Sequence, residues 1–301
     1  MNKFIYLALS HLLLVGLIYI SSAQDTSSSA DDPCNCGDSI SSRIVGGDEV
    51  QPGELPWRVS IFIHHKNESR GSICGGTIID KFWVMTAAHC VDRIASKGST
   101  PSDINIFIGD GSIYRYDSQN GTLRLLSGNN VVIHPKWNRT IVDFDIALIR
   151  VPGGFNFSRP NTARACLPFK FRETTLKNQQ VLASGWGQTS NATNSTSRVM
   201  RRTDLDMMEY EDCNENLQEM NIGNRIDQKK FCCKTPGKDI CQGDSGGSID
   251  YLFEGKYYAF GIVSYVLGFC ANPRGVSVMT RVVEYLDWIL GITGGNYCSP
   301  P

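Results

Sequence analysis

Short runs of β-branched and aromatic residues recur along this chain from Ile44 onward, and they restrict its fold more than any other feature. Clusters of Gly, Pro, Asn and Ser separate these runs, which is the pattern of an all-β sandwich or barrel. Alternating helical segments, which a parallel α/β sheet needs, are absent from the sequence. Near the end, apolar residues from Val282 to Leu290 fall at helical spacing before Gly291, which predicts one amphipathic C-terminal helix. The predicted strands include Trp57–Ile63, Ile104–Ile108, Val131–Ile133, Ile146–Val151 and Tyr257–Val263.

The first residues have the order of a secretory signal peptide. Lys3 supplies a positive charge, an apolar run extends from Phe4 to Ile20, and Ser21-Ser22-Ala23 provides the small residues that a signal peptidase needs. The alternative is a membrane anchor, but this run is at the short end for spanning a bilayer, and no later stretch is long or apolar enough. We therefore expect residues 1–23 to be removed and residues 24–43 to form a polar pro-segment. The mature chain is expected to be secreted and extracellular, with no membrane partner.

Eleven cysteines on a chain with a signal peptide predict a disulfide framework, because the space outside the cell is oxidising. The odd number leaves at least one thiol unpaired or paired between chains. A net charge of -1 gives no reason to expect nucleic acid or an anionic membrane as a partner. The chain contains six Asn-x-Ser/Thr motifs, which are acceptor sites for N-glycosylation in secreted proteins. We expect them to lie on surface loops and to be glycosylated. These acceptors are Asn67, Asn120, Asn138, Asn156, Asn191 and Asn194.

Three short segments carry residue types that fit nucleophilic catalysis. Thr86-Ala87-Ala88-His89-Cys90 offers a histidine, Asp145-Ile146-Ala147-Leu148 puts a carboxylate at the head of an apolar strand, and Gly243-Asp244-Ser245-Gly246-Gly247 sets a serine among glycines. Acyl transfer by a serine needs a hydroxyl, a base that takes its proton and a carboxylate that orients the base. Each segment alone has a structural explanation, such as a turn residue or a neighbour of a disulfide. Together, and in this order, they predict catalysis by His89, Asp145 and Ser245.

At these segments the chain resembles the trypsin-like serine proteases of the chymotrypsin family. The resemblance extends from Arg43 to about Leu290 and implies an all-β fold of two antiparallel six-stranded β-barrels with a C-terminal helix. The barrels would cover residues 44–151 and 161–279, with the cleft between them, and residues 44–301 would form one protease domain. Further motifs that carry the resemblance are Arg43-Ile44-Val45-Gly46-Gly47, Pro56-Trp57, Cys74-Gly75-Gly76, Gly185-Trp186-Gly187 and Ile262-Val263-Ser264.

The resemblance implies a role for each side chain of the triad. His89 would act as general base and then as general acid, while Asp145 would fix its tautomer and stabilise the imidazolium. Asp143 is a rival carboxylate, but the Ile-Ala-Leu after Asp145 fits the family pattern. Phe144 departs from that pattern, because the family usually has Asn there. Ser264 would support the Asp145 carboxylate from the second barrel, and its alternative role is that of an ordinary strand serine.

The oxyanion hole and the activation switch also follow from the resemblance. The backbone N–H groups of Gly243 and Ser245 would bind the oxyanion, and one such donor is worth about 10²–10³ in turnover. The bond between Arg43 and Ile44 looks like an activation bond. After its cleavage the new α-ammonium of Ile44 would turn inward and pair with Asp244, which would order the pocket and the oxyanion hole.

A carboxylate in the substrate pocket indicates specificity for basic side chains. Asp239 lies six residues before Ser245, where trypsin-like members pair with Arg or Lys of the substrate. Ile240 replaces the usual small residue beside it, and Val266 stands where a Gly normally leaves the pocket mouth open. We expect a preference for Arg over Lys, because a guanidinium forms two parallel hydrogen bonds and is less strongly hydrated. The substrate-binding residues implied by the resemblance are Asp239, Ile240, Ser264, Val266 and Gly275.

The disulfide pairs are likewise implied by the resemblance. Cys36 would tie the pro-segment to the protease domain after activation, and Cys34 with Cys298 would form a further pair. Cys233 is then left over, although the adjacent Cys232 and Cys233 could exchange roles. The expected pairs are Cys74–Cys90, Cys213–Cys232, Cys241–Cys270, Cys36–Cys166 and Cys34–Cys298.

Taken together, the sequence predicts a secreted serine endopeptidase zymogen that is cut after Arg43 and then hydrolyses peptide bonds after Arg, and less readily after Lys. Its expected partners are protein or peptide substrates, an activating trypsin-like protease and protein protease inhibitors. No cofactor or metal is expected, since the family's calcium loop would fall near Gly109 to Asn120, where the usual pair of glutamates is missing. The alternative is a protease homologue that acts as a non-catalytic binding module. The Cys-x-Cys-Gly start and the Tyr297-Cys298 end resemble serine proteases of arthropod venom and saliva.

Overall fold

The structure is a computed structural model that describes residues 34–39, 49–66, 71–92, 100–189, 195–223, 226–267 and 275–297. Several sequence predictions lie outside these residues. They are the signal peptide, the Arg43–Ile44 bond, the glycosylation sites Asn67, Asn191 and Asn194, and the cysteines Cys270 and Cys298.

The first half of the described chain forms a seven-stranded antiparallel sheet in the order β5-β4-β1-β2-β3-β7-β6. Its core face follows the period of two that a strand imposes, since Ile104, Ile106 and Ile108 of β4 are fully buried while Phe107 between them is partly exposed. Six strands were expected here. The seventh is present because β5 and β6, on either side of the 3₁₀ turn Gly128–Asn130, are separate strands at opposite edges of the sheet. The strands are β1 Arg58–His65, β2 Ser72–Asp80, β3 Trp83–Thr86, β4 Ile104–Asp110, β5 Thr122–Ser127, β6 Val131–Ile133 and β7 Ala147–Arg150.

The second half forms a closed six-stranded barrel in the order β10-β13-β12-β11-β8-β9, as the family resemblance implied. The register shifts between Ile249 and Asp250 on β11, and again between Val263 and Tyr265 on β12, which leaves Ser264 as the bulged residue. A β-bulge re-aims a side chain and is common beside active sites. The strands are β8 Gln180–Gly185, β9 Arg201–Met208, β10 Lys230–Cys233, β11 Ser248–Phe253, β12 Lys256–Leu267 and β13 Val276–Arg281.

The C-terminal helix begins later and ends later than the sequence pattern suggested. The predicted stretch starts as a 3₁₀ turn, Val282–Tyr285, and continues as α3, Leu286–Thr293. Gly291 lies inside α3, so the predicted end was wrong. Gly294 ends the helix instead, because it adopts φ +59° and its N–H donates to the carbonyl oxygen of Leu290 at 2.9 Å. The other helices within the described residues are α1 Ala88–Val91 and α2 Tyr210–Glu219, with short 3₁₀ turns at Pro101–Asp103 and Phe169–Phe171.

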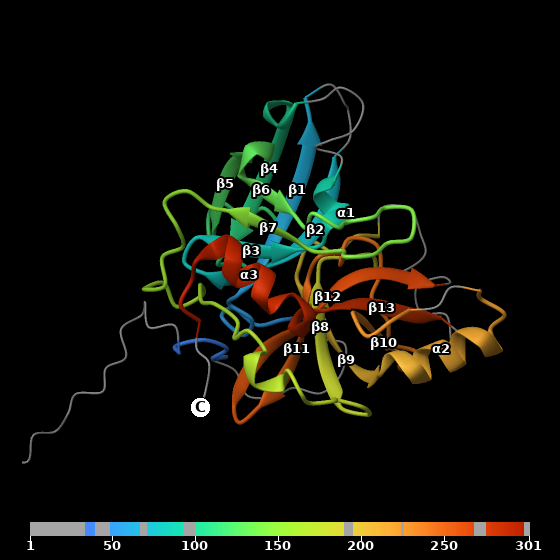
Figure 1. The fold of residues 1–301 in the computed structure, drawn as a ribbon. Coiled ribbons are helices and arrows are strands. Elements are labelled where there is room, and N and C mark those ends of the chain that lie inside the picture. Colours follow the sequence, from blue (N-terminus) through green and yellow to red (C-terminus); the bar gives the residue numbers. More distant parts are fainter. Residues whose placement is uncertain are drawn as a thin grey trace, which may run out of the picture.

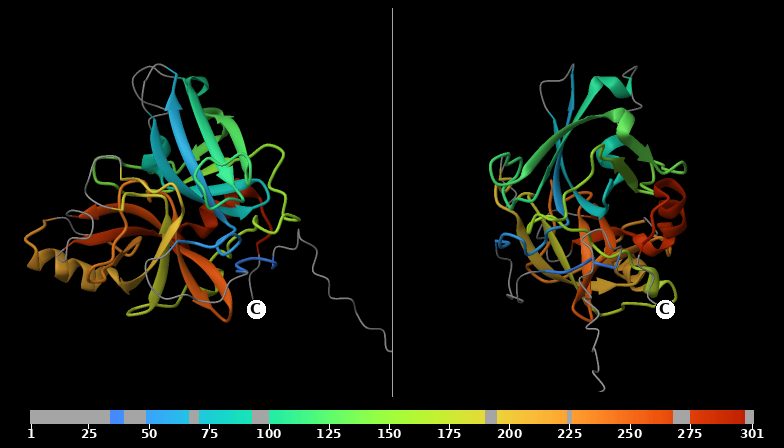
Figure 2. Two further views of the ribbon diagram at one scale, coloured as in Figure 1. Left: turned by 180° about the vertical axis from the view of Figure 1, so that it is seen from behind. Right: turned by 90° about the vertical axis from the view of Figure 1, so that its left-hand side faces the viewer.

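The two halves lie one against the other as separate lobes of one structure (Figure 1). The same division is seen from behind and from the side, with α2 extending from the second barrel away from the first sheet (Figure 2). Helix α3 returns to the first sheet, where Trp288 packs against His134 with ring centroids 5.0 Å apart. The lobes share one apolar core cluster, and a smaller cluster under α2 contains Cys213 and Leu217. No helix within the described ranges has the length and apolar character needed to cross a membrane.

Three disulfides link described cysteines, and they are pairs that the resemblance implied. They are Cys36–Cys166, Cys74–Cys90 and Cys213–Cys232. Cys34 and Cys241 are also disulfide-bonded, whereas their expected partners lie outside the described residues. Cys233 is a free, buried thiol, and burial raises its pKa.

Residues 34–39, which precede the first sheet, are fastened to the second barrel. The Cys36–Cys166 bridge is reinforced by Gly37, whose N–H donates to the carbonyl oxygen of Arg164 and whose own carbonyl accepts from the N–H of Tyr257, both at 2.9 Å. Gly37 adopts φ +69°, and a Cβ there would come too close to the Tyr257 backbone. Residues 34–39 are thus held on the barrel by a covalent bond and by main-chain hydrogen bonds.

Candidate active site

Glycines allow the two lobes to meet closely at the loop that contains Ser245. A Cβ on Gly75 of β2 would lie 3.1 Å from the Cα of Gly247, and a Cβ on Gly246 would collide with the Thr86 hydroxyl. Gly246 also adopts φ +78°, a conformation that L side chains rarely take. The N–H of Gly75 donates to the carbonyl oxygen of Ser245 at 2.7 Å. Ser245 is therefore presented against the segment of the first sheet that leads into α1.

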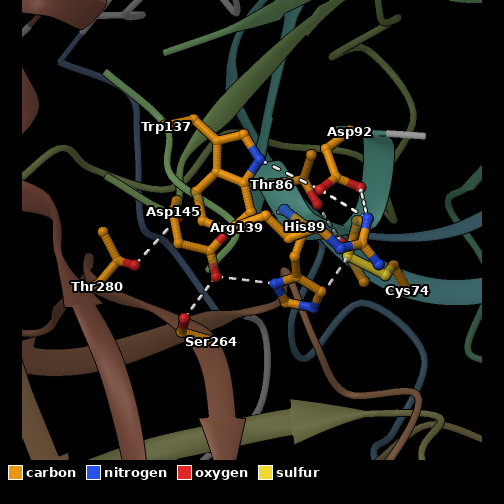
Figure 3. A network of polar contacts seen from close by, with 11 residues as sticks. Cys74, Thr86, His89, Asp92, Trp137, Arg139, Asp145, Ser264 and Thr280 are labelled. Carbon is orange, nitrogen blue, oxygen red and sulfur yellow. Dashed lines mark hydrogen bonds and ion pairs between the residues drawn. A yellow bond between two sulfur atoms is a disulfide. The ribbon is translucent and has the colours of Figure 1, made fainter. Parts of the chain in front are cut away.

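His89 lies in α1 and is held by a buried carboxylate. Its backbone N–H donates to Asp145 Oδ1 at 2.9 Å, and its Nδ1 lies 2.8 Å from Asp145 Oδ2 (Figure 3). The Asp145 side chain has no solvent exposure, while that of His89 is 27% exposed. With Asp145 ionised, Nδ1 carries the proton and Nε2 is left as the basic atom. The pair therefore has the orientation of a general base and its carboxylate partner.

The second barrel completes the surroundings of Asp145. The hydroxyl of Ser264, the bulged residue of β12, donates to Asp145 Oδ2 at 2.5 Å. The hydroxyl of Thr280 on β13 donates to the backbone carbonyl oxygen of Asp145 at 3.0 Å. Ser264 lies where the sequence prediction placed it. Thr280 was not predicted, because nothing in its local sequence distinguishes it from any other buried strand threonine.

Burial and hydrogen bonding act in opposite directions on the acid–base pair. Burial by itself raises the pKa of Asp145, but the hydrogen bonds and charge of His89, together with the Ser264 hydroxyl, hold that pKa below its ordinary value. Burial lowers the pKa of His89, yet its hydrogen bond to Asp145 and the Asp145 charge outweigh this and raise it. The pair therefore stabilises an imidazolium next to a carboxylate that stays ionised.

The rival carboxylate, Asp143, belongs to a different contact. Its Oδ1 lies 2.7 Å from Nζ of Lys230 on the second barrel, and its Oδ2 lies 3.7 Å from Nζ of Lys229. Phe144 between the two carboxylates has φ +56°, which is rare for a non-glycine residue, and its ring stacks on His134 with centroids 4.9 Å apart. The turn at Phe144 thus directs Asp145 toward His89 and Asp143 toward the lysines.

Two backbone N–H groups beside Ser245 are available for an oxyanion. Within the described residues, neither the N–H of Gly243 nor that of Ser245 has a hydrogen-bond acceptor. Gly243 adopts φ +101°, so a side chain there would be strained. The described chain also has no hydrogen bond between the Ser245 hydroxyl and His89 Nε2. Such catalytic hydrogen bonds are often long or poorly aligned until substrate binds.

The Gly-Trp-Gly motif makes room for the Asp244 carboxylate. Its Oδ1 accepts from the N–H of Gly187 at 2.8 Å and its Oδ2 from the N–H of Cys241 at 2.9 Å. A Cβ on Gly185 or Gly187 would collide with this carboxylate. Burial raises the pKa of Asp244, and the two backbone donors oppose that rise. The predicted partner of Asp244, the α-ammonium of Ile44, lies outside the described residues.

The Asp239 carboxylate has a partner that the sequence prediction missed. Asp239 Oδ1 accepts a short hydrogen bond from the hydroxyl of Ser277 on β13, and also accepts from the N–H of Ile240 at 2.8 Å. Ser277 is directly opposite Val266 in the β12–β13 register, and it lies two residues after Gly275. Its local sequence does not distinguish Ser277 from other buried strand residues, so only the tertiary structure identifies it as a partner of Asp239. The structure therefore links Asp239 to the residue of β13 that is paired with Val266 of β12.

Three of the predicted glycosylation sites lie within the described residues. Asn120, Asn138 and Asn156 are exposed, as glycan acceptors must be.

Cys74, His89 and Cys90 bring three potential metal-ligand atoms within 4.8 Å of one another. The two cysteines form a disulfide, so neither offers the thiolate that metal binding needs.

Comparisons with known proteins agree with this geometry. The family model described as Trypsin matches residues 44–289. The chain is 30% identical over 276 residues to the CLIP domain-containing serine protease B4 of Anopheles gambiae, covering 85% of this chain and 71% of that protein. A solved structure of HL collagenase is similar with a TM-score of 0.68 and 27% identity, covering 84% of this chain and 100% of that one. This chain belongs to the trypsin family of serine proteases.

Proposed function

We propose that this protein is a secreted serine endopeptidase precursor which, after cleavage between Arg43 and Ile44, hydrolyses peptide bonds after arginine and, less readily, after lysine. The observation that carries the proposal is the Asp145–His89 pair, with Nδ1 and Oδ2 2.8 Å apart. The serine loop, whose backbone N–H groups at Gly243 and Ser245 have no acceptor within the described residues, packs against Gly75 and Thr86 of the first sheet. A buried carboxylate, an oriented imidazole and free amide donors beside a serine are the parts that acyl transfer needs.

The chemistry follows from the position of each group. His89 Nε2 takes the proton of the Ser245 hydroxyl as its oxygen attacks the substrate carbonyl carbon. The N–H groups of Gly243 and Ser245 bind the oxyanion that forms, and the imidazolium, stabilised by Asp145, gives its proton to the leaving amine. Water then attacks the acyl-enzyme through the same base, and Ser245 recovers its proton as the acid product leaves.

Activation is proposed to act through Asp244. Its carboxylate is buried beside Ser245 and is held in place by backbone donors from Gly187 and Cys241. A buried carboxylate is stabilised when a cation pairs with it, and a new α-ammonium at Ile44 would supply that cation. We therefore propose that an arginine-cutting protease activates the chain. The Cys36–Cys166 bridge would keep the preceding segment attached afterwards.

Asp239 supports the proposed specificity. Its hydrogen bonds from Ser277 and from the N–H of Ile240 fix the orientation of Oδ1. Ile240 is buried and adds an apolar side chain beside the carboxylate. A planar guanidinium is less strongly hydrated than an ammonium and binds a carboxylate with two parallel hydrogen bonds. The proposed partners are accordingly proteins or peptides with exposed arginine, together with protein protease inhibitors that occupy the same pocket.

A panel of fluorogenic peptides that differ only in the residue before the cut tests this proposal. The chain cut behind Arg43 should hydrolyse the Arg peptide fastest, the Lys peptide more slowly, and the Ala peptide poorly, because an uncharged side chain brings no positive charge to the Asp239 carboxylate. The Ser245→Ala variant, treated in the same way, is the control for contaminating activity. Hydrolysis that survives in Ser245→Ala, or no hydrolysis by the cut wild-type chain, would contradict the proposal. The second result would favour a non-catalytic binding module.

A further inference from the structure

The buried side chain of Arg58 bridges the interface between the two lobes, next to the loop that contains Ser245. Arg58 opens β1 and is only 1% exposed. Its Nη2 donates to the carbonyl oxygen of Ser184 on β8 at 2.5 Å. Its Nη1 donates to the hydroxyls of Thr77 on β2 and Ser248 on β11, each at 3.2 Å. One rigid guanidinium therefore joins β1 and β2 of the first sheet to β8 and β11 of the second barrel.

These contacts reach the turn that presents the nucleophile. Ser248 follows Ser245 by three residues, and Gly247 between them lies so close to Arg58 that a Cβ on it would collide with Nη2. The N–H of Gly247 donates to the carbonyl oxygen of Asp244 at 3.1 Å, which closes the turn around Ser245. The guanidinium therefore packs directly on the backbone of the nucleophile turn.

The charge of Arg58 also acts on two buried carboxylates. Burial raises the pKa of both Asp244 and Asp250, and the positive charge of Arg58 opposes the rise in each case. Asp239 acts on Asp244 in the opposite sense, since its negative charge adds to the rise. Asp250 is fixed in place by a hydrogen bond from Trp57 Nε1 at 2.9 Å. A buried charge needs compensation of this kind to remain ionised.

We propose that Arg58 is a positioning residue for the nucleophile. It fixes the turn from Ser245 to Ser248 onto the sheet that carries His89, and it places a positive charge beside Asp244. This inference rests on the proposed function. The hydrogen bonds of Arg58 within the described chain do not involve Asp239, so its loss should misalign Ser245 without removing the substrate pocket. The expected signature is a lower kcat with little change in KM.

Four variants, each cut behind Arg43, test the role of Arg58. A serine-directed phosphonate counts the reactive sites, so that kcat is expressed per labelled Ser245. Arg58→Met should lower kcat at least about tenfold with KM within about twofold, since misplacing reacting groups by 1 Å can cost about 10² in rate. Arg58→Lys keeps the charge but loses the forked geometry, and its kcat should lie between those of Arg58→Met and the wild type. Ser248→Ala removes one acceptor and should lower kcat about threefold.

Arg281→Met is the matched control. Arg281 is also buried, at 6% exposure, and pairs with the buried carboxylate of Glu209 inside the second barrel, away from the nucleophile turn. This variant should lower the unfolding midpoint as Arg58→Met does, while its kcat stays within about twofold of the wild type.

The outcomes separate this inference from the proposed function. Wild-type kcat in Arg58→Met, or equal losses of kcat in Arg58→Met and Arg281→Met, would overturn the role of Arg58 and leave the proposed function intact. If Arg58→Met does not fold, unchanged kcat in both Arg58→Lys and Ser248→Ala would overturn it in the same way. A cut wild-type chain that neither labels nor turns over would overturn the proposed function itself.

Discussion

Replacing Ser264 with Ala removes one of the three hydrogen bonds that the Asp145 carboxylate accepts from described residues. The other two come from the backbone N–H and the Nδ1 of His89, at 2.9 and 2.8 Å, and the Ser264 hydroxyl donates at 2.5 Å. The Asp145 side chain has no solvent exposure, so water cannot easily replace the lost donor. A hydrogen bond to a charged group contributes about 1.5–3 kcal/mol, and the free energy of unfolding at neutral pH should fall by about that amount.

The size of this loss should depend on pH in one direction. The folded-state pKa of Asp145 is lowered, so its contribution to stability is complete above the unfolded pKa of about 3.9 and is lost as the pH falls through the lower folded pKa. Ser264→Ala raises the folded pKa, so the variant loses the contribution at a higher pH than the wild type. Once the carboxyl is neutral in both proteins, the difference should shrink to the value of about 0.5–1.5 kcal/mol typical of a neutral hydrogen bond.

Urea unfolding of both proteins between neutral and acidic pH measures this dependence. Thr280→Val is the matched control, because Thr280 donates to the backbone carbonyl of Asp145, which does not titrate. Its cost of about 1–3 kcal/mol should stay constant over the same pH range. A loss in Ser264→Ala that is as independent of pH as that of Thr280→Val would show that Ser264 does not stabilise the ionised carboxylate.

Three further predictions concern activation and the substrate pocket. Arg43→Gln should remove activation by trypsin, measured as hydrolysis of Arg peptides, and full activity in an uncut chain would contradict the zymogen account. Val266→Gly should raise kcat/KM for Arg peptides because it opens the pocket mouth, whereas a wild-type chain that cuts Ala or Val peptides faster than Arg peptides would mean that Val266 closes the pocket. Ser277→Ala should lower kcat/KM for Arg peptides about tenfold, since it removes a charge-assisted hydrogen bond to Asp239. An unchanged value would show that Asp239 is oriented without it.

Strands with a strong local pattern could be predicted from the sequence. β6 occupies the predicted residues Val131–Ile133, and β12 extends the predicted run Tyr257–Val263 to Lys256–Leu267. β9, Arg201–Met208, was not predicted, because its charged residues and its single β-branched residue give little strand propensity. It forms through pairing with β8 and β10, which is a long-range effect. The end of α3 was also not predictable from the local pattern. Gly291 and Gly294 both follow an apolar stretch, and the sequence alone does not show which of them ends the helix.

In the candidate site, too, residues in short local motifs could be predicted, whereas residues whose partners are far away in the chain could not. His89, Asp145 and Ser245 lie in short segments whose composition is itself unusual, so the sequence could single them out as candidates. Ser277 and Arg58 act through partners that are far away in the chain, and locally they look like ordinary residues of strands β13 and β1. An arginine at the head of a strand is normally exposed, and only the tertiary structure reveals that Arg58 is buried at the interface between the two lobes.

The stoichiometry of Ser245 labelling before and after cleavage behind Arg43 tests the central claim most directly. The precursor and the trypsin-cut chain are treated with a serine-directed phosphonate, and peptide mapping locates and counts the adduct. The account predicts near-zero labelling of the precursor and about one adduct per cut chain, located on Ser245 and absent from Ser245→Ala. An unlabelled cut chain, or an adduct on another serine, would contradict the assignment of Ser245 as the nucleophile.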